Sequence, residues 1–250
     1  MVLAKPGKIL PALLFALSFD TLLLNPGKSL VNIVKIDPAL KAKCPRAALG
    51  CVSANVEAKE TSQALEALLQ DCEHGTLKLP DPRAALESSA ILATRSGYKA
   101  LGKDPARYRG SAEALLRRII ACKGLPRIHA VVDIINIVSV ESGLPVGLYD
   151  LAHVQGQVTF RAGRAGETYK GIGKYDLNLE DLPLFADDLG PHGSATSDSE
   201  RTMVTPATKC VLAILVSFGG TENLERHCER LQSLLTEHAS GTNFRHVIVE

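Results

Sequence analysis

The sequence carries almost no excess charge of either sign. Its 28 Lys and Arg residues stand against 27 Asp and Glu residues, which gives a formal net charge of +1, and both signs are mixed along the chain. Proteins that hold nucleic acid by charge alone have a strongly basic face or segment. That class is excluded, so any contact with RNA must be local.

Clustered cysteines are also missing. The six cysteines lie far apart, without a C-x-x-C pair or a Cys/His spacing typical of zinc sites. Gly171-Ile172-Gly173 lacks the third glycine of a dinucleotide-binding loop, and there is no G-x-S-x-G nucleophile elbow. We therefore expect no metal and no cofactor, and we interpret the cysteines as reduced thiols of a cytoplasmic protein.

A hydrophobic run long enough to cross a membrane is absent. The apolar stretch Ile9–Phe19 superficially imitates a signal peptide, but it is too short for a bilayer and is interrupted by Pro11 and ended by Asp20. We expect no membrane association, and secretion stays open as the alternative. Residues 1–33 are predicted to be an extension of unknown role, and residues 34–250 to form one domain.

An apolar share of 46% with 22% charged residues indicates a folded core. The near-continuous apolar run Lys209–Phe218 is short enough for a central strand. Asp81-Pro82 predicts the start of a helix that continues to Gly97. Together with the remaining pattern this predicts an α+β domain whose mixed or antiparallel central sheet is flanked by helices. Further strands are predicted at 47–56, 157–162, 182–186 and 244–249, and further helices at 61–74 and from Ser111 and Thr221.

Residues 131–150 give conflicting local signals. β-Branched residues dominate the segment, which favours a strand. Asp133 suits a helix N-cap, Gly143 suits the position after a helix, and Pro145 follows where a helix must have ended.

This segment resembles the B3/B4 editing domain of the phenylalanyl-tRNA synthetase beta subunit. It matches the signature V-V-D-x-x-N-x-V-x-x-E-x-G-x-P, which forms a helix in that family, and the likeness covers about 170 residues by order of motifs. Flanking matches are Cys44-Pro45-Arg46 with Gly50, Leu116–Ile128 and Val158–Glu167, whereas 107–115 and 196–202 look more like free-standing members of the superfamily.

The resemblance implies a trans-acting deacylase that hydrolyses a wrongly attached amino acid from the 3′ aminoacyl end of tRNA, with water as the nucleophile. Two positions depart from the family pattern: Gly147 replaces a His, and Ile214 replaces a Glu that reads a tyrosine hydroxyl. Tyrosine specificity is therefore not carried over. The alternative is a non-catalytic module that binds RNA or an amino acid, and synthetase activity is not expected because ATP-binding class II motifs are missing.

The polar stretch 196–202 supplies the candidate catalytic residues. Its density of hydroxyls and charges favours substrate binding, with a solvated turn as the alternative. We expect Asp198 and Glu200 to position water, and the hydrogen-bonding candidates to be Thr196, Ser197, Arg201 and Thr202, extended by Thr205.

Two further groups are candidates for substrate binding. Arg109, Ser111 and Glu113 lie at a predicted helix start, where they either orient an anion or form a cap with a surface ion pair. Asn136 and Glu141 fall on adjacent turns of the signature helix, where they either line the site or bind the next loop. The isolated His129 and His192 are interpreted as loop residues satisfied by neighbours.

Overall fold

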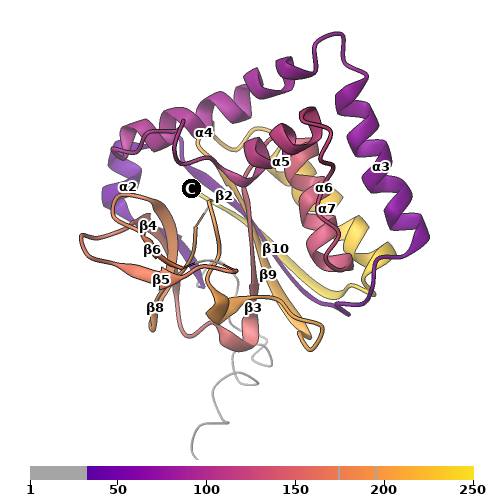
Figure 1. The fold of residues 1–250 in the computed structure, drawn as a ribbon. Helices are drawn as coiled ribbons and strands as arrows, with labels where there is room; N and C mark the ends of the chain where they lie inside the picture. Colours follow the sequence, from indigo (N-terminus) through magenta and orange to yellow (C-terminus); the bar gives the residue numbers. More distant parts are fainter. Residues whose placement is uncertain (1–32, 174, 195) are drawn as a thin grey trace, which may run out of the picture.

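The computed structural model describes residues 33–250, apart from residues 174 and 195. Figure 1 shows two sheets side by side, with helices packed on one of them and across the top. The prediction of an α+β fold with mixed and antiparallel sheets flanked by helices is confirmed. The predicted extension falls almost wholly outside the described residues, so the boundary at residue 34 stays a prediction.

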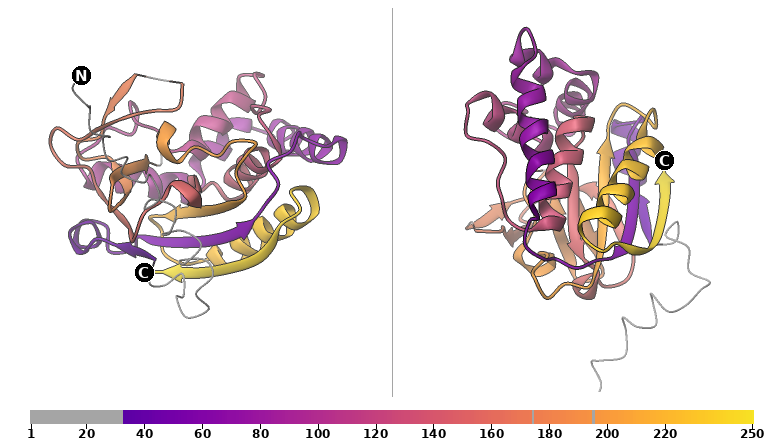
Figure 2. Two further views of the ribbon diagram at one scale, coloured as in Figure 1. Left: turned by 90° about the horizontal axis from the view of Figure 1, so that it is seen from below. Right: turned by 90° about the vertical axis from the view of Figure 1, so that its right-hand side faces the viewer.

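The central sheet is antiparallel throughout. All eight residues of β9 pair with β2, from Ala48 opposite Ser217 to Asn55 opposite Cys210. The predicted central strand at 209–218 is therefore confirmed. The strand order is β10 (Thr242–Val249), β2 (Ala48–Asn55), β9 (Cys210–Ser217) and β3 (Val146–Asp150), and Figure 2 shows β10 on the outer edge beside β2.

The second sheet is mixed, because its first pair of strands runs parallel and the others antiparallel. A separate two-stranded hairpin lies beside it. The order in the second sheet is β1 (Val34–Ile36), β4 (Val158–Ala162), β7 (Pro183–Asp187) and β8 (Gly190–Ser194), and the hairpin consists of β5 (Thr168–Lys170) and β6 (Asp176–Asn178).

Each face of the central sheet is covered by its own hydrophobic core. Val211, Ala213 and Leu215 of β9 pack into the core shared with the helices, whereas Leu212 and Ile214 pack into the core shared with the second sheet. Alternation of side chains along a strand produces this division. The helices of the first core are α3 (Gln63–Leu77), α5 (Ser111–Ile120), α6 (Ala130–Ser142) and α7 (Leu224–His238), while α2 (Pro38–Lys43) and α4 (Ser89–Ala100) lie beyond it.

The signature segment folds as the helix α6 followed by the strand β3, which resolves the conflict in its sequence. Gly143 ends the helix with a φ of 69°, as expected. Asp133 is not the N-cap, because the helix begins one turn earlier after His129. Its carboxylate instead accepts hydrogen bonds from the Ile128 amide at 3.0 Å and from the Thr61 hydroxyl. Burial among α3, α5 and α7 outweighs the strand preference of the β-branched residues.

The prediction of one helix between residues 81 and 97 is wrong. Asp81 caps a 3-10 helix, η2 (Pro82–Glu87), after which Ser88 adopts an extended conformation and caps α4 as a new helix. Gly97 does not end α4, which continues to Ala100. A Cβ at Gly97 would overlap the ring of Phe218. The glycine serves close packing of α4 on the sheet.

All six cysteines are unpaired. Over the part of the chain that the structure describes, no helix is both long enough and apolar enough to cross a membrane. The same residues contain no group of three or more His, Cys, Asp or Glu side chains that could hold a metal ion.

We expect Ile134→Ala to lower the free energy of unfolding by about 2 to 5 kcal/mol, because Ile134 is fully buried in the helical core. Urea unfolding at constant pH measures this loss. Ile128→Ala is the matched control, because that side chain is 64% exposed, and its effect should stay within about 0.5 kcal/mol. Equal losses in both variants would contradict the assignment of this core.

Candidate functional site

The start of α5 is tied to the start of β3. Gly110 is the N-cap, without a side-chain hydrogen bond, and Ser111 is the first helical residue. The Ser111 hydroxyl accepts a hydrogen bond from the Val146 amide at 3.2 Å. A Cβ at Gly110 would lie 2.8 Å from Pro145, so the two segments approach closely. Ser111 therefore fixes the beginning of the strand that continues the signature.

Glu113 is buried in an ion-pair cluster. Its carboxylate lies 3.0 Å from Arg95 and 2.9 Å from Arg117, whereas Arg109 is 3.9 Å away. Burial alone would raise the pKa of Glu113, but hydrogen bonds from Arg95 and Arg117 hold the pKa below its usual value. Glu113 thus matches the ion-pair alternative, and Arg109 remains the loosely held cation of the group.

The polar stretch 196–202 is held against the second sheet and α4. The Thr196 hydroxyl lies 3.0 Å from the hydroxyl of Tyr98 on α4. The Ser197 carbonyl accepts hydrogen bonds from the Ser194 and Tyr169 hydroxyls. These contacts make the first half of the stretch an ordered loop and leave the Ser197 hydroxyl without a hydrogen bond to the described residues.

Asp198 is the carboxylic acid that this loop carries inward. Burial raises its pKa to about 7, and the nearby Leu148 backbone, Tyr149 hydroxyl and Ser194 backbone lower the pKa only in part. Its Oδ1 atom and the Tyr149 hydroxyl are both buried and face each other, and neither has another hydrogen-bond partner among the described residues. Buried polar atoms nearly always have a partner, so the phenol and the carboxyl serve each other.

Tyr149 occupies space that two glycines leave open. A Cβ at Gly147 would overlap the Tyr149 hydroxyl, and a Cβ at Gly193 would overlap its ring. Gly147 also lies directly opposite Ile214 in the pairing of β3 with β9. The two positions that depart from the family signature are therefore neighbours, and the phenol hydroxyl lies over one of them.

His192 is fully buried with its ring edge-on to Tyr149, at 4.6 Å between ring centroids. Burial lowers its pKa to about 4, and the Arg201 charge lowers it further while Asp187 opposes the shift. The imidazole is therefore neutral. Both ring nitrogens of His192 lack a hydrogen-bond partner among the described residues, so the expectation that a neighbour satisfies this histidine is not met. His129 lies beside the Val204 backbone.

The second half of the stretch holds the loop in place. Arg201 forms a two-pronged ion pair with buried Asp187, at 2.9 and 3.0 Å, and the Thr202 hydroxyl donates to the His192 carbonyl at 3.2 Å. Exposed Glu200, in η4 (Glu200–Thr202), pairs with Lys170 at 3.0 Å. Thr205 accepts from the Ala207 amide in the following turn. Among the predicted acids, only Asp198 is buried beside other unsatisfied polar atoms in the described structure.

Asn136 and Glu141 are not brought to this loop. Both belong to α6, which packs in the helical layer on the opposite face of the central sheet. Glu141 pairs with Arg230 of α7 through hydrogen bonds of 3.0 and 3.1 Å. The part of the signature that meets the 196–202 stretch is β3, not the helix.

Sequence reasoning missed Tyr98 and Tyr149. Tyr149 stands in the aromatic-Asp pair of the signature, which was the only signal for it, and Tyr98 carries none. Together with Thr196, Ser197 and Asp198 they form the candidate site, a set of hydroxyls beside one carboxyl. Such a set can take a proton from water and donate hydrogen bonds to an oxygen atom.

The chain is similar to several known proteins. A family described as the B3/4 domain matches residues 93–240. The phenylalanine–tRNA ligase beta subunit of Chromobacterium violaceum is 38% identical over 79 residues, which is 31% of this chain and 10% of that protein. The corresponding subunit of Brucella abortus is 32% identical over 87 residues, 34% of this chain and 11% of that protein.

The chain thus spans about a tenth of the length of these curated relatives. Among solved structures, an N-terminal fragment of the phenylalanyl-tRNA synthetase beta-subunit from Pyrococcus horikoshii is similar, with a TM-score of 0.46 and 17% identity over 87% of this chain and 51% of the fragment. Because the family match covers more than half of the 250 residues, the chain belongs to the B3/4 domain family.

Proposed function

We propose that this protein hydrolyses a mischarged aminoacyl ester from the 3′ end of tRNA, acting in trans in the cytoplasm. The observation that carries the proposal is the buried Asp198 carboxyl with a pKa of about 7. A general base works best when its pKa lies near the working pH. Asp198 is moreover adjacent to the position at which the resemblance places a His and this chain has Gly147.

The reaction needs one proton acceptor and hydrogen-bond donors. The Asp198 carboxylate takes a proton from water as the water oxygen attacks the ester carbonyl carbon. The Ser197 and Thr196 hydroxyls are the donors for the oxyanion that forms. The bond between that carbon and the ribose oxygen then breaks, the proton passes to the ribose oxygen, and the products are the free amino acid and deacylated tRNA.

Tyr149 acts in this scheme as a positioning residue. Its hydroxyl faces Asp198 from above Gly147, so it favours the charged form of the carboxyl and fixes its orientation. The remaining predicted residues support the loop, because Arg201 and Thr202 anchor it and Ser111 anchors β3.

A non-catalytic module that binds RNA or an amino acid is the second candidate. Gly147 and Ile214 lie opposite each other in the pairing of β3 with β9. Neither residue supplies a polar group for chemistry or for reading a tyrosine hydroxyl, and this favours the non-catalytic module. Release of amino acid from a panel of mischarged tRNAs separates the two functions. Affinity without release above the uncatalysed rate would support the module and remove the hydrolase.

We expect Asp198→Asn to lower the rate of ester hydrolysis by about 100-fold or more, because general base catalysis typically contributes 10²–10⁴-fold. Single-turnover release of labelled amino acid measures it. In the wild type the rate should rise about tenfold per pH unit below pH 7 and level off above it, as Asp198 loses its proton near its pKa of about 7. Asp71→Asn, which changes an exposed carboxyl of α3, is the matched control.

The Tyr149→Phe variant should move the midpoint of the pH–rate profile to higher pH. Removal of a hydroxyl that favours the carboxylate raises the pKa of Asp198 further. A merely structural role for Tyr149 would lower the rate at every pH without moving the midpoint, and that result would count against its assignment.

The pKa of Asp198 also has a consequence for stability that does not depend on catalysis. The folded-state pKa of about 7 exceeds the value of about 4 for an unfolded chain, so the stability that protonated Asp198 contributes is complete below about pH 4 and is lost as pH rises to about 7. The free energy of unfolding of Asp198→Asn, relative to that of the wild type, should therefore rise between about pH 4 and about pH 7. Above pH 7 the difference between the two proteins should stay constant. Urea unfolding at pH 5 and pH 8, with Asp71→Asn alongside, measures the difference. A constant difference would show that Asp198 does not titrate near pH 7.

A further inference from the structure

A concentration of positive charge borders the candidate site, despite the near-neutral composition of the chain. We name residues 99–109, which are the last two residues of α4 and the loop that follows it, the basic loop. It contains Lys99, Lys103, Arg107 and Arg109 against a single acid, Asp104, within eleven residues. The loop begins one residue after Tyr98, which contacts Thr196, so its first end is fixed at the site. It ends two residues before Ser111, which is tied to the start of β3.

Most of the cations of the basic loop are not in ion pairs, although the Asp181 carboxylate lies beside Gly102. Among the described residues, Lys99, Lys103 and Arg107 have no ion pair, and the contact of Arg109 with Glu113 is 3.9 Å long. Glu113 is already bound at shorter distance by Arg95 and Arg117. The Asp104 carboxylate accepts a hydrogen bond from the Ala106 amide.

Tyr108 holds two of these cations in place. The Lys103 ammonium lies 5.0 Å from the centre of the Tyr108 ring, and the Arg107 guanidinium carbon lies 5.7 Å from it. Such cation–π contacts stabilise a cation while leaving its hydrogen-bond donors available. Backbone hydrogen bonds from the Tyr108 amide to the Asp104 carbonyl and from the Lys103 amide to the Tyr98 carbonyl order the loop itself.

We infer that the basic loop binds the phosphodiester backbone of the RNA strand whose 3′ end carries the ester to Asp198. This inference rests on the proposed function. Lysine and arginine are the usual partners of backbone phosphates, and such contacts position the nucleic acid without reading its sequence. Because the loop follows directly on Tyr98, which contacts Thr196, one RNA strand with its 3′ end at Asp198 reaches the cations of the loop.

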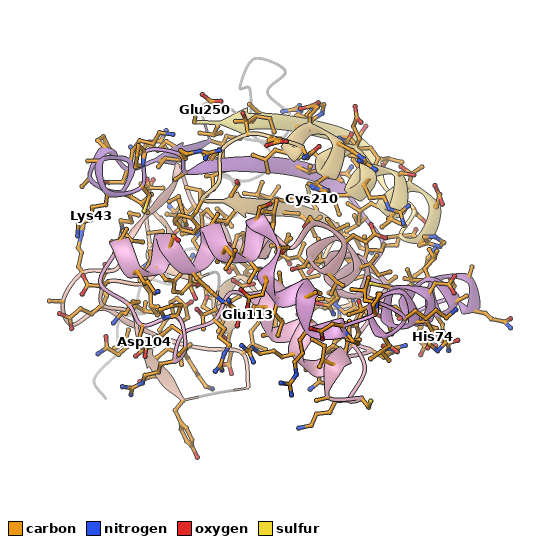
Figure 3. All side chains as sticks on the ribbon, turned by 90° about the horizontal axis from the view of Figure 1, so that it is seen from above. Lys43, His74, Asp104, Glu113, Cys210 and Glu250 are labelled. Atoms are coloured by element: carbon orange, nitrogen blue, oxygen red, sulfur yellow. The ribbon has the colours of Figure 1, made fainter. Side chains whose placement is uncertain are left out.

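The composition of the loop favours RNA over a membrane surface. A basic segment that lies on a bilayer also presents exposed large apolar side chains. In the basic loop the large apolar side chains are Leu101, which is 2% exposed, and Tyr108, which is partly buried and covered by Lys103 and Arg107. Figure 3 shows Asp104, within the loop, and Glu113, just beyond it, on one side of α4. Cys210 of the central sheet and Glu250, which follows β10, lie on the other side.

The test compares a double variant, Lys103→Gln with Arg107→Gln, against Lys78→Gln with Lys123→Gln. The control removes the same charge from two exposed lysines outside the loop. Binding of unfractionated, unacylated tRNA is measured by fluorescence anisotropy between 50 and 200 mM salt. We expect the loop variant to raise the Kd about tenfold and to reduce the slope of log Kd against log salt by about 1.4, which is about 0.7 for each single-strand phosphate contact.

An unchanged Kd and slope in the loop variant would overturn the inference, as would equal changes in the control pair. Binding of phosphatidylserine vesicles that depends on Lys103 and Arg107, without RNA binding, would also overturn it in favour of a membrane. RNA binding requires no catalysis. A wild type that binds tRNA through this loop but releases no amino acid therefore supports the loop and contradicts only the hydrolase.

Discussion

The structure depends on the burial of the central strand β9 on both of its faces. Side chains of β9 alternate between a core shared with four helices and a core shared with the second sheet. Because each face is covered, β9 and its neighbour β2 are apolar along nearly their whole length. Polar groups of the central sheet are therefore confined to its rims, where backbone and side chains can find partners other than apolar atoms.

The same alternation decides which half of the signature contributes to the site. Val146 and Leu148 of β3 face the helices, so Tyr149 faces the second sheet, where the 196–202 loop carries Asp198. The carboxyl is enclosed by aromatic and backbone groups and not by cations, which is why burial dominates its pKa. Asp187, only eleven residues earlier, has its pKa lowered, because hydrogen bonding to Arg201 overcomes the effect of its own burial. The pKa values of these two aspartates thus shift in opposite directions, because an arginine pairs with Asp187 and none pairs with Asp198.

The sequence predicted the parts of the fold that have local signals. The apolar run of β9, the glycine at position 143 and the cap at Asp81 each carry a physical reason within a few residues, and each is found as expected. The break at Ser88 was missed, because two capping signals seven residues apart are compatible with one helix or two. For the candidate site, the sequence points to the hydroxyl-rich loop and to Asp198, and these stay predictions, whereas Asn136 and Glu141 rest on helical spacing alone and lie in another layer. Helical spacing tells which residues share a face and not which layer that face meets. Tyr149 could not be found locally, because its role arises from glycines on two different strands.

The Tyr149 side chain fits between the sheets because positions 147 and 193 are both glycine. A side chain at either glycine would overlap the phenol, and loss of the phenol would leave a void between the sheets. Any side chain larger than hydrogen at position 147 or 193 therefore has to move the phenol away from its present place. Such a movement also displaces the hydroxyl group that faces Asp198. The two glycines thus control the environment of the carboxyl without contacting it through side chains of their own.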